Sequence, residues 1–389
     1  MRMLNILGVT GSIGTNTLRV ISEDSKNDDL KINIVSGNNN VELLAQFAIE
    51  FNAKYAVIAN SDKYQKLKEC LFGSSVIPVA GTDELIKLCE EPVDWTMNAI
   101  VGFAGLAPSL AVAKTGKALA LANKESLVCG GALLTKEIGQ SNGTLLPVDS
   151  EHNAIFQCLR HENISTVHKL ILTASGGPFR DWTKEKMNKV TLEEALQHPN
   201  WDMGAKISID SATMFNKALE VIEAKHLFNV KSSEIEVLIH RQSIIHSLVS
   251  FCDGSVIAQL GNPDMRGAIG FTLNYPDRLP LSVDKLNLLD HPNLSFEKVD
   301  SKKFPALKLA YNVLESEGLL STVLNAAKEV AVEKFIRKQI KFLDIVRVVE
   351  EVLQSAAVSK LETNNIYDIN QIKAADELAR QEANLIKLS

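Results

Sequence analysis

Short apolar runs alternate with helical patterns through the first part of the chain. Between the apolar runs, hydrophobic residues recur at helical spacing, as in Val41–Phe51 and Leu106–Thr115. Regular alternation of this kind predicts a parallel, doubly wound sheet with a helix after each strand, the Rossmann-like arrangement. The runs expected to form its strands are Leu4–Val9, Lys31–Ser36, Tyr55–Ala59, Ser75–Val79, Trp95–Ala99, Ala118–Ala122 and Thr144–Val148.

The pattern changes beyond this region. Three further strand-like runs, Glu236–Ile239, Ser243–Ser250 and Val256–Leu260, indicate a mostly antiparallel sheet. A stretch rich in Pro, Asp and Leu then indicates a linker, followed by helical periods only. The helices are expected at Ala306–Ser316, Ser321–Lys338, Phe342–Ser355 and Ile369–Lys387. We therefore predict an α/β protein with a Rossmann-like domain (1–149), a central α+β domain (150–274), a linker (275–303) and a C-terminal α-helical domain (304–389).

Composition narrows the function classes. The chain has 389 residues, more than a single hydrophobic core usually supports, so more than one domain is expected. Hydrophobic residues make up 46% of it, and its net charge is −6. This acidic balance argues against non-specific nucleic-acid binding. The five cysteines show no CxxC, so neither a zinc ribbon nor a disulfide framework is expected. The N-terminus has no targeting pattern and the longest weakly charged segment, Ala99–Ala113, is too short to span a bilayer, which predicts a cytoplasmic protein without a membrane partner.

A glycine-rich turn follows the first apolar run. Gly8, Gly11 and Gly14 are spaced GxxGxxG, and a helical pattern follows them. Glycines allow close backbone approach to a pyrophosphate, and a helix N-terminus favours anions, so we expect a dinucleotide here. The second run ends in Gly37 without the acidic residue that typically binds the ribose 2′-hydroxyl of NAD, which favours NADPH. The alternative is a glycine turn without a ligand.

Two sets of polar residues follow later strands of the predicted sheet. Asn123, Lys124 and Glu125 come after one strand, at the edge where open α/β sheets bind ligands. A polar helix start explains them equally well. Asp149, Ser150 and Glu151 follow the next strand, with Ser150 expected to cap a helix. Paired carboxylates suit Mg²⁺, although isolated surface acids are usually only solvated.

The central region supplies groups suited to a phosphorylated substrate. Ser175 begins a Ser-Gly-Gly turn whose backbone amides could hold a phosphate, and Ser211 is expected to cap the following helix. On that helix Asn216, Lys217 and Glu220 share one face, although a Lys–Glu pair at this spacing is more often a surface salt bridge. The intervening segment near 175–205, with its His, Trp and glycine, is a candidate lid. The alternative is a structured loop whose Trp belongs to the core. His246 lies in a predicted strand, where a lone His is more often a core or interface residue than a catalytic one.

These stretches together resemble one enzyme family, 1-deoxy-D-xylulose 5-phosphate reductoisomerase. The resemblance runs in order along essentially the whole chain. It is carried by GVTGSIGTNTL, ALANKESLV, LLPVDSEHNAIFQ, LTASGGPFR, HPNWDMGAKISIDSATMFNKALEVIEA, QSIIHS, DGSVIAQLG and PDMR. It implies a homodimer that rearranges and reduces a sugar phosphate to 2-C-methyl-D-erythritol 4-phosphate for isoprenoid biosynthesis, with NADPH and Mg²⁺ or Mn²⁺. Catalysis and dimerisation would then belong to the central domain.

The resemblance also implies roles for particular residues. The metal ligands, and with Lys124 the catalytic groups, would be Asp149, Glu151 and Glu220. The substrate would contact Lys124, Ser150, Glu151, Ser175, His198, Trp201, Met203, Ser211, Asn216, Lys217, Glu220 and His246. The cofactor would contact Thr10, Gly11, Ser12, Ile13, Gly37, Asn38, Asn39, Asn123, Glu125 and Gly204.

Three positions depart from the family pattern. Asn38 stands where many members have a basic residue, which affects the expected strength of the preference for NADPH over NADH. Arg241 replaces a common proline, and Ala174 a common glycine.

Two other functions are weighed against the resemblance. A simple NADP-dependent sugar-phosphate dehydrogenase does not require the three carboxylates, and a non-catalytic dinucleotide sensor does not require a metal.

Overall fold

Two compact units make up the chain. The structure is a computed structural model that describes residues 1–23, 29–197, 204–316, 318–361 and 368–387. The first unit comprises Met1–Ser126, Leu134–Asn153 and Asp264–Asp284. The second comprises Leu127–Leu133, Ala154–Pro263 and Lys285–Ser389. Beside these two units, the four-part division expected from the sequence stays a prediction.

The first unit is built on the expected parallel sheet. Its strand order is β4-β3-β2-β1-β5-β6-β7, and every neighbouring pair is parallel. The direction of winding reverses between β1 and β5, which creates a topological switch point at their carboxyl ends. The strands are β1 (Arg2–Leu7), β2 (Leu30–Gly37), β3 (Tyr55–Ile58), β4 (Ile77–Ala80), β5 (Trp95–Asn98), β6 (Ala118–Leu121) and β7 (Thr144–Pro147).

Helices connect these strands, as the sequence predicted. The strands read as nearly continuous apolar runs because helices cover both faces of a sheet of this kind, and four consecutive residues of β1 are buried. The helices are α1 (Ser12–Glu23), α2 (Val41–Glu50), α3 (Tyr64–Cys70), α4 (Thr82–Cys89), α5 (Leu106–Ala113), α6 (Lys124–Ser141) and α7 (Ser150–Cys158), with 3₁₀ turns η2 (Ser61–Lys63) and η3 (Phe103–Gly105).

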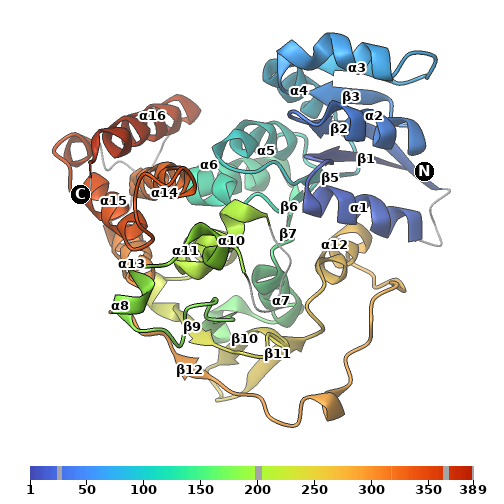
Figure 1. The fold of residues 1–389 in the computed structure, drawn as a ribbon. Helices are drawn as coiled ribbons and strands as arrows, with labels where there is room; N and C mark the ends of the chain where they lie inside the picture. Colours follow the sequence, from blue (N-terminus) through green and yellow to red (C-terminus); the bar gives the residue numbers. More distant parts are fainter. Residues whose placement is uncertain (24–28, 198–203, 317, 362–367, 388–389) are drawn as a thin grey trace. The chain divides into compact units, whose positions relative to one another are not determined.

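A segment distant in sequence completes this unit. Helix α12 (Met265–Asn274) packs beside α1, as Figure 1 shows. The Trp95 indole Nε1 donates to the Thr272 carbonyl at 3.0 Å, and an Arg2 guanidinium nitrogen donates to the Leu273 carbonyl at 2.9 Å. These hydrogen bonds connect α12 to β5 and β1, so the helix is part of the first unit, which contains the parallel sheet.

The second unit contains the mostly antiparallel sheet. Its order is β11-β10-β8-β9-β12, in which only β8 and β9 are parallel. Its strands are β8 (Val167–Ala174), β9 (Ile235–Ile239), β10 (Ile245–Phe251), β11 (Val256–Leu260) and β12 (Glu297–Lys298). Around them lie α8 (Lys184–Met187), α9 (Leu192–Ala195), α10 (Ala205–Ala212), α11 (Phe215–Phe228) and the 3₁₀ turns η4 (Ile164–Thr166), η5 (Ser232–Glu234) and η6 (Leu288–Asp290).

The C-terminal part is helical, as predicted. It contains α13 (Ala306–Ser316), α14 (Leu320–Ile336), α15 (Asp344–Leu353), η7 (Val358–Lys360) and α16 (Ile369–Leu385). Helix α14 packs on both α15 and α16. An edge-to-face contact between the rings of Phe335 and Phe342, with centroids 5.8 Å apart, is part of this packing. In the part of the chain that the structure describes, no helix has both the length and the apolar character that crossing a membrane requires.

Candidate active site

The glycine turn after β1 is shaped by close backbone approach. Gly8 has φ of 81°, and a Cβ there would lie 2.6 Å from the Ala99 carbonyl oxygen of the loop after β5. Gly14 lies in α1, where a Cβ would lie 2.4 Å from the Gly8 carbonyl oxygen. Only glycine permits either approach, so the turn brings the N-terminus of α1 against the carboxyl end of β1. This is the position at which doubly wound sheets bind dinucleotide phosphates.

The residues expected to contact a cofactor gather around this turn. Thr10, Gly11, Ser12 and Ile13 form the turn and the first residues of α1, and Gly11 and Ser12 are exposed. Gly37 lies beside them, since a Cβ at Gly37 would be 3.2 Å from the Thr10 methyl group. The Val9 amide donates to the Ser36 carbonyl at 2.8 Å, which joins the turn to the end of β2.

The end of β2 has no carboxylate, as the sequence indicated. Asn38 and Asn39 are exposed, and the Asn60 amide donates to the Asn39 side-chain oxygen at 2.9 Å. Asn40 caps α2 by accepting from the Leu43 amide at 3.2 Å. A ribose 2′-phosphate would therefore meet neutral amides rather than an acid at this edge.

Asn123 caps α6 and holds the loop after β5. Its side-chain oxygen accepts from the Ser126 amide at 2.9 Å, and its Nδ2 donates to the carbonyls of Ile100 and Gly102 at 2.6 and 2.9 Å. Nδ2 also donates to the Glu125 carboxylate at 2.9 Å. Asn123 therefore forms the polar helix start that was the alternative interpretation of these residues. A cofactor contact by Asn123 or Glu125 stays a prediction.

Lys124 and Asp149 form an ion pair within the first unit. The Lys124 ammonium lies 2.9 Å from Asp149 Oδ2, and each side chain is 14% exposed. The other carboxylate oxygen of Asp149 accepts from the Glu151 amide at 3.3 Å, at the start of α7. The expectation that Ser150 is the N-cap is therefore wrong, because Asp149 occupies the capping position and Ser150 is already helical.

The start of α7 concentrates further polar groups. The Ser150 hydroxyl donates to the Glu151 carboxylate at 2.5 Å. The fully buried His152 has its Nδ1 3.6 Å from Asp149 Oδ1. Sequence reasoning missed His152, because a lone His inside a helical stretch carries no distinguishing pattern. Asp149, Ser150, Glu151 and His152 thus form one cluster of oxygen and nitrogen donors at the carboxyl edge of β7.

The Ser-Gly-Gly turn of the second unit lies against α10. Gly176 and Gly177 have φ of 83° and 69°, and the Gly177 amide donates to the Ser175 hydroxyl at 3.2 Å. A Cβ at Gly177 would lie 3.0 Å from the Ser211 carbonyl oxygen, so the turn containing Ser175 packs on the segment containing Ser211. Ser211 itself lies inside α10. The expectation that it caps the next helix is wrong, since Met214 stands at that N-cap without a side-chain hydrogen bond.

Asn216, Lys217 and Glu220 meet on α11, as their spacing predicted. The Glu220 carboxylate accepts from the Asn216 amide and from the Lys217 ammonium, each at 2.5 Å. Glu220 is 0% and Lys217 4% exposed. The pair is therefore not the surface salt bridge that the i,i+3 spacing most often produces.

Of the remaining residues predicted to bind substrate or cofactor, three lie outside the described part of the chain and two lie within it. His198, Trp201 and Met203 fall within 198–203, so the segment predicted to be a lid is only partly described. Gly204 is the exposed N-cap of α10. His246 is buried on β10, and the Thr173 hydroxyl next to the end of β8 bonds its carbonyl at 2.7 Å. His246 thus lies in the strand beside the one that leads into the Ser175 turn.

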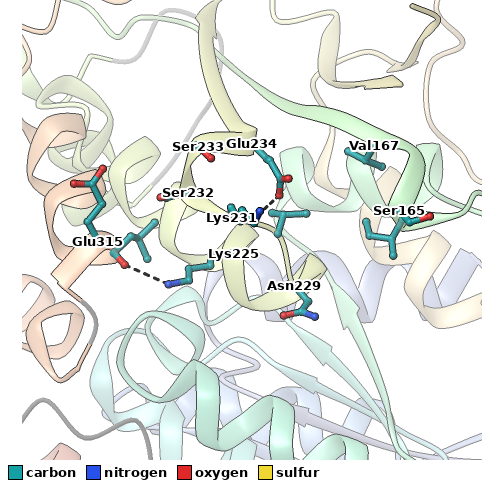
Figure 2. Close-up of a pocket in the computed structure, with 12 residues that line it drawn as sticks. Ser165, Val167, Lys225, Asn229, Lys231, Ser232, Ser233, Glu234 and Glu315 are labelled. Carbon is teal, nitrogen blue, oxygen red and sulfur yellow. Dashed lines mark hydrogen bonds between the residues drawn. The ribbon is translucent and has the colours of Figure 1, made fainter. Parts of the chain in front are cut away.

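A hollow of the second unit is separate from these residues. Figure 2 shows it between the C-terminal end of α11 and η5, with Lys225 donating to the Leu314 carbonyl at 3.3 Å. Its volume is about 680 Å³, and none of the residues predicted to bind substrate lines it. We assign the hollow no part in the active site.

Comparison with known proteins matches the chain along its length. The family model for 1-deoxy-D-xylulose 5-phosphate reductoisomerase matches residues 4–131, and the model of that enzyme's C-terminal domain matches 145–228. A model described as DXP reductoisomerase C-terminal domain matches residues 260–382. The three models between them include all the described residues of the glycine turn, α7 and α11.

Relatives and solved structures agree with these models. The 1-deoxy-D-xylulose 5-phosphate reductoisomerase of Rhizobium rhizogenes is 49% identical over 99% of this chain and 96% of its own. That of Sinorhizobium medicae is 50% identical over 98% and 97%. The Zymomonas mobilis enzyme in complex with NADPH has a TM-score of 0.90 at 46% identity, covering 98% of both chains. A DOX-P reductoisomerase in complex with NADPH, fosmidomycin and magnesium has a TM-score of 0.94 at 40% identity, covering 99% and 98%. The chain therefore belongs to the 1-deoxy-D-xylulose 5-phosphate reductoisomerase family.

Proposed function

We propose that this chain converts 1-deoxy-D-xylulose 5-phosphate into 2-C-methyl-D-erythritol 4-phosphate, a step of isoprenoid precursor biosynthesis. The carbon skeleton is rearranged first, and NADPH then reduces the product of rearrangement. The observation that carries the proposal is identity of about half the residues with reductoisomerases over nearly the full length of both chains. Solved relatives bound to NADPH and to magnesium support the cofactor and the metal.

The glycine turn is the proposed NADPH site. Gly8 and Gly14 let α1 approach the end of β1 closely, which suits a pyrophosphate held by backbone N–H groups at the helix N-terminus. Thr10, Gly11, Ser12 and Ile13 would line the pyrophosphate, with Gly37, Asn38 and Asn39 near the ribose. Neutral asparagines at the end of β2 accept a 2′-phosphate without charge repulsion, but they supply no positive charge. We therefore expect a preference for NADPH that is weaker than in a protein with a basic residue there.

Asp149, Glu151 and Glu220 are the proposed metal ligands. The donor set fits a hard divalent cation, because all three offer carboxylate oxygens and Mg²⁺ and Mn²⁺ favour oxygen ligands. Each carboxylate is already oriented by a neighbour: Lys124 bonds Asp149, Ser150 bonds Glu151, and Asn216 and Lys217 bond Glu220. Such outer contacts fix the direction of a ligand before the metal arrives.

The proposed phosphate site lies in the second unit. Ser175 and Ser211 come from segments that pack on each other, and Asn216 and Lys217 follow on α11. His246 comes from the strand beside β8. A positively charged ammonium with hydroxyl and amide donors suits a phosphate monoester. Binding of this remote group would supply free energy for aligning the reacting carbons.

Bound metal and NADPH would supply Lewis acidity and hydride, and the chain supplies orientation and electrostatics. The Lys124 ammonium offsets the charge of Asp149, and we expect it also to donate to a substrate oxygen. Ser150 and His198 would bind the sugar portion, and Trp201, Met203 and Gly204 would belong to a lid that excludes water. These assignments rest on the resemblance of the motifs.

One assay tests the function against its rivals. Oxidation of NADPH is followed with 1-deoxy-D-xylulose 5-phosphate, with Mg²⁺ or Mn²⁺ present and after chelation, and the product is identified by mass and NMR. We expect turnover that requires the metal and yields a branched product. Turnover that persists after chelation, or a product with an unbranched skeleton, would indicate a simple NADP-dependent dehydrogenase. Binding of NADPH without turnover would indicate a dinucleotide sensor.

We further propose that the chain forms a cytoplasmic homodimer. Strand β11 lies at one end of the second sheet, and its Val256 and Ile257 are 54% and 38% exposed. An apolar edge strand is suited to pairing with a second copy. The five cysteines, all in the described part of the chain, form no disulfide, which suits a reducing compartment. Sedimentation analysis of the wild type and of Ile257→Lys tests the dimer; a monomeric wild type would contradict it.

A further inference from the structure

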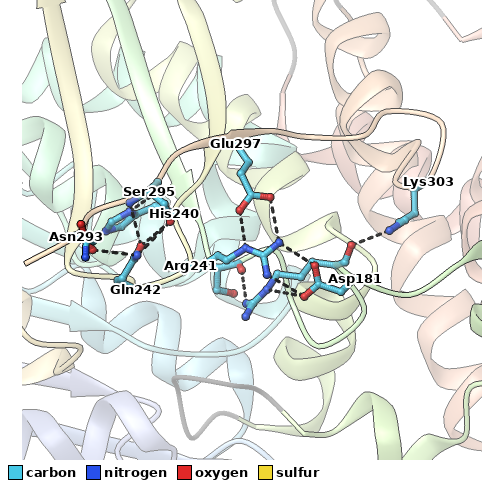
Figure 3. Close-up of polar contacts among 10 residues, drawn as sticks. Asp181, His240, Arg241, Gln242, Asn293, Ser295, Glu297 and Lys303 are labelled. Carbon is cyan, nitrogen blue, oxygen red and sulfur yellow. Dashed lines mark hydrogen bonds and ion pairs between the residues drawn. The ribbon is translucent and has the colours of Figure 1, made fainter. Parts of the chain in front are cut away.

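The guanidinium group of Arg241 joins two distant segments of the second unit. Arg241 lies in the turn between β9 and β10. It donates to both carboxylate oxygens of Asp181 at 2.8 and 2.9 Å, and to both of Glu297 at 2.5 and 3.1 Å, as Figure 3 shows. Both interactions are bidentate, the geometry in which Arg binds carboxylates most strongly. Hydrogen bonding to Arg241 lowers the pKa of both carboxyl groups, so the three side chains are charged together near neutral pH.

Asp181 lies in the loop between β8 and α8, which begins with the Ser175 turn. The Arg180 guanidinium donates to the Ser175 carbonyl at 2.8 Å, and its side chain packs on Gly176, where a Cβ would lie 3.1 Å away. The Lys303 ammonium donates to the Arg180 carbonyl at 2.7 Å. The loop therefore closes on itself, and its far end is tied down by Arg241 and Lys303. A change in the position of Asp181 would reach Ser175 through Arg180.

Glu297 provides a fixed anchor for this arrangement. Glu297 and Lys298 form β12, which pairs with the end of β9. The fully buried His240 bonds the Ser295 carbonyl through Nδ1 at 2.9 Å, and its ring stacks on Phe296 with centroids 5.0 Å apart. Gln242 donates to Ser295 Oγ at 3.1 Å. The segment before Glu297 is thus bound to the residues on either side of Arg241, whereas Asp181 is an exposed residue of the loop after β8.

We propose that Arg241 is a positioning residue that holds the Ser175 turn in the conformation that binds the substrate phosphate. The inference rests on the proposed function. Its physical basis is that Arg241 links a loop next to a predicted phosphate ligand to a strand that other hydrogen bonds already fix.

The alternative is an ordinary surface ion-pair network that contributes only to stability. Asp181 is 60% and Glu297 44% exposed, and exposed pairs are individually weak. The two interpretations differ in kinetics. If the network only stabilises the fold, breaking it should lower the melting temperature and leave KM unchanged. A positioning residue would raise KM for the phosphorylated substrate and leave KM for NADPH unchanged, because the predicted NADPH residues other than Gly204 belong to the first unit.

Steady-state kinetics of four variants separate these possibilities. We expect Arg241→Gln and Asp181→Asn each to raise KM for 1-deoxy-D-xylulose 5-phosphate about threefold to tenfold, with the melting temperature followed in parallel. The double variant should show no further rise, since both changes break the same link. Arg241→Lys should restore KM only partly, because an ammonium cannot bind both carboxylates bidentately.

Arg337→Gln is the matched control. Arg337 is also a surface arginine of the second unit, paired with Glu333 at 3.0 Å within one helix, and its KM should equal that of the wild type. A wild-type enzyme that turns over the substrate, combined with an unchanged KM in both Arg241→Gln and Asp181→Asn, would overturn the inference. An inactive wild type would instead count against the proposed function itself.

Discussion

Replacing Gly14 with alanine tests how closely α1 must approach the end of β1. A Cβ at Gly14 would lie 2.4 Å from the Gly8 carbonyl oxygen and 2.5 Å from the Val9 Cα. Ordinary contact begins at 3.4 Å, so the helix must retreat by about 1 Å (3.4 minus 2.4). Both obstructing atoms belong to the backbone of the turn and cannot rotate away. The N-terminus of α1 would therefore move from the place where we expect the pyrophosphate.

The size of the effect follows from two opposing contributions. Alanine in place of glycine stabilises a helix interior by about 1 kcal/mol, whereas overpacking at a closed contact costs about 1–3 kcal/mol. We expect Gly14→Ala to lower the free energy of unfolding by about 1 kcal/mol overall and to weaken NADPH binding by roughly tenfold or more.

Gly139 provides a control within the same protein. It is an exposed residue of α6, and a Cβ there would have no atom within 4 Å. Gly139→Ala should therefore stabilise the protein by about 0.5–1 kcal/mol and leave NADPH binding unchanged. Urea denaturation gives the stabilities, and fluorescence titration gives the affinities for NADPH. If Gly14→Ala proves as stable as Gly139→Ala and binds NADPH like the wild type, the close approach is not what this turn requires.

Three further predictions concern the second unit. Glu220→Gln should reduce kcat by roughly a hundredfold or more while NADPH binds normally; near-normal kcat would reject Glu220 as a metal ligand. Lys217→Ala should raise KM for the phosphorylated substrate, and should also lower the unfolding free energy by about 3 kcal/mol because Glu220 keeps a buried charge. An unchanged KM would argue against the phosphate assignment. Burial, with Lys225 nearby, lowers the pKa of His226 to about 4, so the unfolded chain binds more protons between about pH 6.5 and 4. The unfolding free energy should therefore fall on acidification through this window, by on the order of 2–3 kcal/mol, and His226→Gln should show a flatter dependence in urea titrations at pH 7 and 5.

Local patterns predicted most of the fold because they reflect burial of contiguous segments. Helix α13 has the expected bounds, Ala306–Ser316, and the alternation of strands and helices in the first unit is confirmed. The position of α12 could not be predicted in this way. Met265–Asn274 has an ordinary helical pattern, and nothing in its own residues identifies α1 as its partner. Such long-range pairing is determined by the shape of the whole unit rather than by sequence period.

The two capping predictions failed for a related reason. Ser150 and Ser211 are residues that commonly cap helices, and both precede helical stretches. In the structure, Asp149 takes the capping role at α7, because its carboxylate reaches the Glu151 amide. Ser211 falls inside α10, and the chain turns at Met214 in a left-handed conformation before α11 begins. Preference for a cap identifies a residue type, whereas the backbone path selects which of several neighbours fills the position.

The environment of α11 explains why its polar residues were ambiguous in the sequence. All residues from Lys217 to Ala224 are buried, so this part of the helix has no solvent-facing side from which a polar stripe could be recognised. Burying the Lys217–Glu220 pair costs desolvation energy that mutual attraction seldom recovers in full, and apolar residues of similar volume would often be at least as stable. The buried Lys217–Glu220 pair, with the half-buried Asn216 bonded to it, is therefore better explained by a binding role than by packing. This argument favours Asn216, Lys217 and Glu220 as site residues independently of the family to which the chain belongs.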